Sequence, residues 1–520
     1  MRTFIFIAIS LLILFSPAFA VLEIPNTQPK VGAKQWKLVL DNTWKGMKKR
    51  NVDAYNTGLL HRPKSEAPGD AVSEGIGYGM LLALYADDQV YFDKMYNASK
   101  QHGLNACNNW RVRFDNGFCE HCEGSASDAD EDIGLSLIFA AKLKEIGIWG
   151  NSNINYANEA QGVVDCIWDY LRSDGGLPPG SQWDPGYNIG YFAPAFYRIF
   201  NNFDSKKRDW MKAVNTSYRI IEASPAYDIG MVPDWANHDG GFHGGGGLGY
   251  NPYLSGNAFF KDAIRVLWRI ANDYIWFKEA RAKAFLEKSL AFITKEGGPD
   301  AANFYQLQGA NKGKLVPAED KWTEFNEQTN SNTWRWRREH SHLTVGQWLT
   351  AAMAVGTDED KIAWSSKMAE FYDWENKVGF FGNAVDPKGG QEDTLHNEMY
   401  FDQFLAWFGV SLMSGTWMNV IDVLDNPKPN VEGITTLPWP EPEPPNSIIA
   451  KNNKLLGIQI NQGSGIIRMS SKSEVSWKIH NLQGKLLFSS NSRETSWNTG
   501  NFKGTVIVSA NSERKLIAVR

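Results

Sequence analysis

The stretch Ser-Glu-Gly-Ile-Gly-Tyr-Gly-Met at residues 73–80 decides which kind of fold this sequence can form. It opens a helical pattern over residues 74–86, and several further stretches of the chain carry apolar residues at three- and four-residue spacing. Three glycines near the start of one helix cost helix stability. The pattern therefore predicts that backbone packs closely around Glu74.

Helical patterns alternate with loops rich in Gly, Pro, Asn and Asp from about Lys34 to Gly415. No convincing strand pattern lies between them, which argues against a parallel α/β sheet and for layers of helices. The predicted helices are Trp36–Arg50, Glu74–Ala86, Ile133–Ile146, Val163–Leu171, Pro194–Phe200, Lys206–Ile221, Asp262–Phe277, Ala280–Phe292, Leu343–Ala354 and Phe401–Ser414.

The two ends of the chain differ from this helical part. Residues 1–20 have a basic start, an apolar run and an Ala-Phe-Ala site, which is typical of a cleaved export signal. Residues 436–447 are too rich in proline to continue a helix, so we expect a linker there. Residues 448–520 show short alternating runs and predict a small all-β domain, a β-sandwich. We therefore expect a helical domain over residues 21–435, followed by the linker and this domain.

Composition excludes some classes of protein. The net charge is -5, and no basic run could follow a nucleic-acid backbone. After the first 20 residues no stretch is apolar enough to span a membrane. The chain has 21 Trp, 18 Tyr and 28 Phe. Most of these will be core, but aromatic rings are also platforms for the flat faces of sugars.

The four cysteines allow two interpretations. In an oxidising compartment, Cys107, Cys119, Cys122 and Cys166 would form two disulfides. Alternatively, Cys107, Cys119 and Cys122 with His102 or His121 have spacing that suits a zinc site.

Three segments place a carboxylate at or near a predicted helix start: residues 72–75, 125–130 and 261–265. Taken one at a time, each fits helix capping, and Ser127 with Asp130 has capping-box spacing. Taken together, they offer what glycosidic hydrolysis requires, namely one carboxylic acid and one carboxylate. A helix N-terminus favours the ionised form, so the acid must have its pKa raised by burial or by a negative neighbour.

These segments resemble glycoside hydrolase family 8. Residues 73–80 look like that family's general-acid motif, and residues 126–133 look like its signature segment. Residues 191–197, 232–235 and 262–270 follow in the family's order. The resemblance implies an all-α (α/α)6 barrel catalytic domain, in which inner helices point their N-termini at a cleft.

The resemblance also implies roles for individual residues. Glu74 would be the general acid, Asp262 the general base, and Asp128 the residue that holds and distorts the sugar at the −1 subsite. Tyr191 and Arg265 would line that subsite. The residue before Asp262 is often Tyr in relatives but is lysine here. Its ammonium group would lower the pKa of Asp262 if it lay close by.

One further position carries a binding role. Trp235, from the matching motif at residues 232–235, is a candidate substrate-binding residue.

Direct displacement by water would invert the anomeric centre, and the two catalytic carboxyl groups would then lie about 6.5–9.5 Å apart.

The function that follows is a secreted or cell-surface, inverting glycoside hydrolase cutting internal β-1,4 linkages of plant polysaccharide, without a cofactor or metal. An endo-β-1,4-glucanase is the first choice and an endo-β-1,4-xylanase the alternative. A non-catalytic glycan-binding protein is the alternative of another class. The C-terminal module resembles a type IX secretion sorting domain, whose partner would be the secretion machinery. It could instead be a carbohydrate-binding module that uses Trp477 and Trp497 as stacking platforms.

Overall fold

The chain forms two compact units in the computed structural model, Met1–Trp439 and Pro440–Arg520. The division falls inside the predicted proline-rich linker, which, like the predicted export signal, lies outside the described residues. The structure describes residues 33–62, 70–114, 122–243, 257–316, 325–326, 331–332, 340–372, 379–382, 400–421, 459–463, 466–481, 486–498, 504–510 and 513–519.

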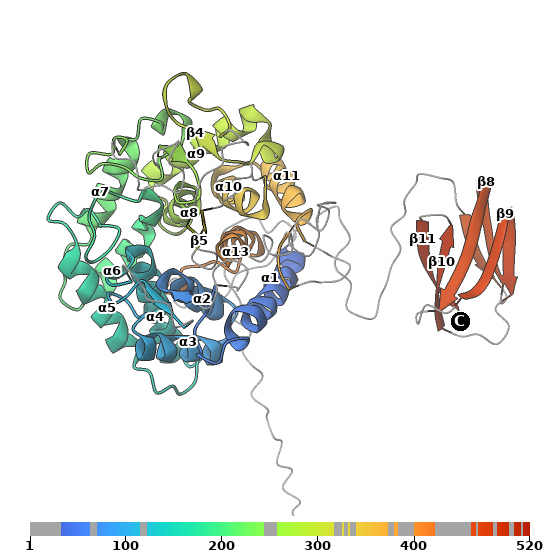
Figure 1. Cartoon of the computed structure of the whole chain (residues 1–520), viewed down its shortest axis with the longest axis horizontal. Coiled ribbons are helices and arrows are strands. Elements are labelled where there is room, and N and C mark those ends of the chain that lie inside the picture. Colours follow the sequence, from blue (N-terminus) through green and yellow to red (C-terminus); the bar gives the residue numbers. More distant parts are fainter. Residues whose placement is uncertain are drawn as a thin grey trace, which may run out of the picture. The chain divides into compact units, whose positions relative to one another are not determined.

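The first unit is a double ring of helices (Figure 1). Each inner helix contacts the next around a closed ring; five of them pack against the outer helix that follows them in sequence, and the last packs against the first helix of the domain, which closes the outer ring. The predicted (α/α)6 barrel agrees with this arrangement. The inner helices are α2 (Ser73–Tyr85), α4 (Ser127–Glu145), α6 (Pro194–Phe203), α8 (Val266–Phe277), α10 (His342–Val355) and α13 (Tyr400–Ser414). The outer helices are α1 (Ala33–Met47), α3 (Gln89–His102), α5 (Tyr156–Tyr170), α7 (Met211–Glu222), α9 (Ala280–Glu296) and α11 (Asp358–Ala369).

The glycines of α2 allow the close packing that the sequence predicts. A Cβ atom on Gly77 would lie 2.9 Å from the Cβ of Asp132 and 3.2 Å from the carbonyl oxygen of Ala129, both on α4. Helices α2 and α4 therefore cross with almost no space between their backbones. This contact brings the start of α2, with Glu74, beside the start of α4, with Asp128.

Replacing Gly77 with alanine is expected to destabilise the protein by about 1–3 kcal/mol, because the added methyl group must push α4 away. Gly162 on α5 is the matched control, since a Cβ atom there meets nothing within 4 Å. Its change to alanine should raise the free energy of unfolding by up to about 1 kcal/mol through helix propensity. Urea denaturation of both variants measures the difference, and equal effects of both changes would contradict the close α2–α4 contact.

The helix starts correct the capping interpretation. Ser127 lies inside the first turn of α4 rather than before it, and its hydroxyl group makes no capping hydrogen bond. The Ser73 hydroxyl group likewise lacks a hydrogen-bond partner, and Asp262 makes no capping bond. The capping box predicted for Ser127 and Asp130 is therefore wrong. Capping boxes do occur at Ser341 before α10 and at Thr357 before α11.

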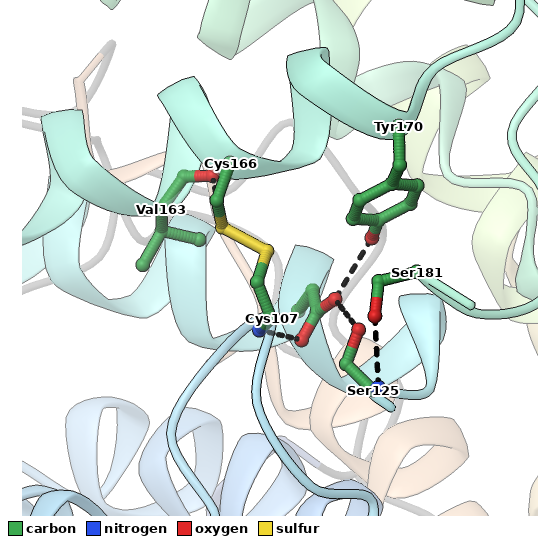
Figure 2. The surroundings of a disulfide bond; sticks show 7 residues. Cys107, Ser125, Val163, Cys166, Tyr170 and Ser181 are labelled. Carbon is green, nitrogen blue, oxygen red and sulfur yellow. Dashed lines mark hydrogen bonds between the residues drawn. A yellow bond between two sulfur atoms is a disulfide. The ribbon is translucent and has the colours of Figure 1, made fainter. Parts of the chain in front are cut away.

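The cysteines form disulfides. Cys107 is bonded to Cys166 of α5, with their Cα atoms 6.2 Å apart (Figure 2). Cys122 is also disulfide-bonded, whereas Cys119 lies outside the described residues. A zinc site that uses Cys107 is excluded, because its sulfur is already in a covalent bond.

The second unit contains one five-stranded antiparallel sheet, in which β8 pairs with β7, β9 and β10, and β10 pairs with β11. Hydrogen-bonded ladders join all the described strands of this unit, and their arrangement as a β-sandwich stays a prediction. Trp477 is fully buried in the small core of this sheet and donates its indole N–H to the Ser492 carbonyl oxygen. It is therefore a core residue and cannot be an exposed sugar platform. The strands are β7 (Gln459–Gly463), β8 (Ile466–Asn481), β9 (Leu486–Asn498), β10 (Gly504–Ala510) and β11 (Glu513–Val519).

Candidate active site

One buried arginine binds the three carboxylates that the sequence singled out. Nη1 of Arg265 lies 2.7 Å from Oε2 of Glu74 and 2.8 Å from Oδ2 of Asp128. Its Nη2 lies 2.7 Å from Oδ1 of Asp262. Arg265 and Asp128 are each 1% exposed, Asp262 is 7% exposed, and the side chain of Glu74 is 16% exposed. The starts of α2 and α4 and the turn before α8 thus place the three acidic groups around one cation.

The guanidinium group of Arg265 also lies near two aromatic rings. It lies 4.7 Å from the centre of the Tyr191 ring and 5.5 Å from that of Phe401, both within the range of cation–π attraction. Its Nε donates to the carbonyl oxygen of Asp262. Tyr191 and Arg265 therefore lie against each other, and their predicted role of lining the −1 subsite stays a prediction.

This cluster contains more acidic groups than positive charge. Burial raises the pKa of the Glu74 carboxyl group to about 8; the Arg265 charge opposes this shift, and the neighbouring Asp128 charge adds to it. A buried group that cannot find a cation of its own takes a proton instead. Glu74 is thus held in the protonated form at neutral pH, which is the form that a general acid needs.

Asp262 has different neighbours. Burial also raises the pKa of its carboxyl group, but the charge of Arg265 opposes the shift, as do the neighbouring donor groups of the Asn188 and Trp235 side chains. Donors of this kind favour the carboxylate form. The two carboxyl groups therefore share one cation but differ in their other contacts, and the protonated form is favoured at Glu74.

Asp234 supports the turn that carries Asp262. Its Oδ1 accepts hydrogen bonds from the backbone N–H groups of Phe260, at 3.1 Å, and Ala263, at 2.8 Å. These two residues flank Asp262, so the buried carboxyl group of Asp234 fixes the backbone on both sides of it. Burial, together with the charge of Asp262, raises the pKa of Asp234 well above its usual range.

Trp235 lies beside the predicted base rather than on an open face. It is 6% exposed, and its ring packs against that of Trp183, with 5.1 Å between the ring centres. Trp183 is 48% exposed, so it presents the open aromatic surface here. A direct contact of Trp235 with substrate stays a prediction.

Two sequence expectations change in the structure. Lys261 lies 3.9 Å from Asp402, and Asp262 takes its positive neighbour from Arg265 instead. The hydroxyl group of Tyr400 donates to Oε1 of Glu74, a contact that the sequence analysis missed. The predicted helix Phe401–Ser414 begins one residue after Tyr400, whereas α13 begins at Tyr400 itself. The position of Tyr400 at a helix start is the feature of the sequence that could have pointed to it.

The described residues hold no group of three or more His, Cys, Asp or Glu side chains that could bind a metal ion. No helix among them is long and apolar enough to cross a membrane.

The fold and the site together define a helical-barrel protein whose buried acidic groups are arranged for acid–base chemistry. The sequence profile of glycosyl hydrolases family 8 matches residues 35–297, about half of the chain. The chain therefore belongs to glycosyl hydrolase family 8.

Individual relatives agree with this placement. Endoglucanase A of Acetivibrio thermocellus is 34% identical over 284 residues, which cover 52% of this chain and 56% of the relative. Endoglucanase 2 of Ruminiclostridium josui is 34% identical over 281 residues, covering 52% and 58%. The matched stretch thus spans somewhat more than half of these relatives' length. The solved β-1,3-1,4-glucanase of Paenibacillus sp. X4 has the same fold, with a TM-score of 0.55 at 19% identity over 76% of this chain and 96% of that one.

Proposed function

We propose that this chain is an exported, inverting glycoside hydrolase that cleaves internal β-1,4 linkages of plant polysaccharide, with β-glucan as its first substrate. The observation that carries the proposal is the binding of Glu74, Asp128 and Asp262 to one buried arginine. A protein that only bound glycan would not need a protonated and an ionised carboxyl group held on the same cation.

The proposed reaction is a single displacement. Glu74 gives its proton to the glycosidic oxygen as the bond from that oxygen to the anomeric carbon breaks. Asp262 removes a proton from the water molecule that attacks the same carbon from the opposite face, so the configuration inverts. Asp128 holds the sugar at the −1 subsite, and Arg265 keeps the three carboxyl groups in place. These steps need no cofactor, because the carboxyl groups carry out the proton transfers.

The pKa of Glu74 predicts the alkaline limb of the pH profile. The general acid acts only when protonated, so kcat/KM should fall as the pH rises above about 8. On the acid side, Asp262 must be ionised, and its raised pKa should move the loss of activity above the pH of an ordinary aspartate. Initial rates from pH 4 to 10 on a soluble oligosaccharide measure both limbs. An alkaline limb near pH 5 would contradict a protonated Glu74 at neutral pH.

The choice of glucan rests on the two endoglucanases, which are 34% identical to this chain. The exo-oligoxylanase Rex8A of Paenibacillus barcinonensis is less similar, at 24% identity. Xylan is therefore the alternative substrate.

The direct experiment measures reducing-sugar release and loss of viscosity with the full chain on carboxymethyl cellulose, lichenan, xylan and chitosan, with Glu74→Gln as the control. Rapid loss of viscosity on a glucan, absent in the variant, is the expected result. Activity on xylan alone would show that xylan, rather than β-glucan, is the substrate. Folded protein that is inactive on all four polymers but retains binding would support the glycan-binding alternative.

Export is supported by two features that do not depend on each other. Residues 1–20 have the pattern of a signal peptide, and disulfides such as Cys107–Cys166 persist in oxidising compartments. We propose that the C-terminal module directs sorting by type IX secretion, since the buried Trp477 argues against the stacking alternative. Deletion of residues 446–520 should then abolish surface display, and it would leave display intact if the module only binds carbohydrate.

A further inference from the structure

A single loop contacts the starts of both helices that carry Glu74 and Asp128. The carbonyl oxygen of Trp110 accepts the backbone N–H of Ser73, the residue before Glu74, at 2.8 Å. Strand β2 (Arg111–Arg113) continues this loop and pairs with β1 (Asp70–Val72), which leads directly into α2. In the same loop, the backbone N–H of Cys107 donates to Oδ1 of Asp130 at 2.8 Å. A shift of this loop would therefore also move the first turns of α2 and α4.

The loop is tied to the barrel at Cys107. Its disulfide with Cys166 joins the loop to α5, as Figure 2 shows. The backbone of Cys107 has a φ of 60°, a left-handed conformation that non-glycine residues seldom adopt. Such a conformation persists only where the surroundings hold it in place. The disulfide is the covalent part of those surroundings.

The carboxylate of Asp130 accepts hydrogen bonds from the loop and from α5. Besides the Cys107 N–H, its carboxylate accepts the hydroxyl groups of Ser125, at 2.6 Å, and of Tyr170, at 2.8 Å (Figure 2). Tyr170 lies on α5, one turn beyond Cys166, so α5 contacts Asp130 directly and also through the disulfide. Asp130 is fully buried. Its three donors come from three different segments and fix the side chain in one orientation.

The position of Asp130 connects this network to the reaction. It lies in the first part of α4, two residues after Asp128, whose Oδ2 binds Arg265. Within α4, the Asp128 side chain accepts the backbone N–H of the next residue, Ala129, at 2.9 Å. The rotation of the first turn of α4 decides where Asp128 points, and Asp130 fixes that rotation through the loop and α5.

We propose that Asp130 is a positioning residue for Asp128, and that the Cys107–Cys166 disulfide must be formed before the first turn of α4 takes its working orientation. This inference rests on the proposed function, because its effect on turnover requires Asp128 to act on the sugar. Because the disulfide is needed for this orientation, the enzyme reaches full turnover only after Cys107 and Cys166 are oxidised. This suits a protein that is made in a reducing compartment and used outside it.

The test compares Asp130→Asn and the double variant Cys107→Ser/Cys166→Ser with the full-length wild type. Misplacement of a reacting group by about 1 Å costs as much as about 10²-fold in rate, so kcat should fall about 10- to 100-fold in both variants, with a smaller change in KM. The matched control is Asp204→Asn. Asp204 is also fully buried and also accepts a backbone N–H and side-chain donors, from Lys206, Arg208 and Trp210, but it contacts no part of the site described above.

Two further measurements separate positioning from general stability. Reductant should lower the activity of the wild type reversibly and leave the double variant unchanged, which assigns the effect to this disulfide rather than to that of Cys122. Amide hydrogen exchange should become faster at residues 73–75 and 127–130 in both variants but not in Asp204→Asn. Should the double variant fail to fold, Tyr170→Phe, which removes one donor to Asp130, is expected to give a smaller effect of the same kind.

The inference is overturned if kcat falls no more than in an equally destabilised Asp204→Asn, or if exchange at residues 127–130 is unchanged. The exchange measurement also keeps the two proposals apart. If the wild type cleaves no glycan, the proposed function fails, while faster exchange at the two helix starts would still show that the disulfide orders them.

Discussion

Replacing Glu74 with glutamine is expected to lower kcat on a β-1,4-glucan by about 10²–10⁴-fold, the contribution usual for general acid catalysis. Glutamine can turn its oxygen towards Arg265 and donate its amide N–H to the Tyr400 hydroxyl oxygen, but it has no acidic proton to give to the leaving group. The free energy of unfolding should change little at neutral pH, because Glu74 is already uncharged there and glutamine has nearly the same shape. Steady-state kinetics and urea denaturation measure the two quantities.

The leaving group tests the role of Glu74 as an acid. The dinitrophenolate group of a dinitrophenyl glycoside leaves as a stable anion without protonation, so Glu74→Gln should recover much of its activity on that substrate. Glu131→Gln is the matched control, because Glu131 is a fully buried glutamate on α4 that bonds to Tyr197 rather than Arg265. If Glu74→Gln turns over polymeric substrate at the wild-type rate, the assignment of the acid is wrong.

Replacing Asp262 with asparagine is expected to cause a loss of similar size, about 10²–10⁴-fold in kcat, for a different reason. The amide can still accept from Arg265 but cannot take a proton from the attacking water. The activity should therefore stay low on the dinitrophenyl glycoside as well, since attack by water is needed whatever the leaving group. Kinetics on both substrates distinguish the base from the acid.

The stereochemistry of the product completes the test of Asp262. Proton NMR during the first minutes of wild-type hydrolysis should show the α-anomer before mutarotation. Asp273→Asn is the matched control, because Asp273 is buried on α8, the helix that follows Asp262, but is bound by Arg198 and Tyr218. Retention of the β-configuration, or normal turnover by Asp262→Asn, would contradict a base at this position.

Helices were predictable to the extent that they bury a regular apolar face. The inner helices were found because their apolar residues recur along the whole element. The outer helices α3 and α11 were missed, although their end signals are present. Asp88 caps α3, Gly103 ends it with a φ of 71°, and Thr357 forms a capping box with Asp360. These signals are short and local, so they do not identify a helix by themselves when the apolar pattern is sparse.

The start of α5 shows a second limit. The sequence predicted a helix over Val163–Leu171, whereas α5 begins at Tyr156, after the cap formed by Asn155. Its first turns contain a run of polar and small residues, Ala157 to Gly162, which gives almost no periodic signal. Packing of Tyr156 into the core decides that these turns are helical.

The sequence by itself determined the helical class, the carboxylates at the starts of helices, and the change to strands near the C-terminus, because these follow from local spacing. Only the tertiary structure decided what each carboxyl group contacts. Arg265 is 191 residues from Glu74 and 137 from Asp128, and Tyr400 is 326 from Glu74. The raised pKa of Glu74 and the pairing of Cys107 with Cys166 depend on such distant neighbours and on burial. Local pattern carries no information about either, since closing the barrel is what brings these groups together.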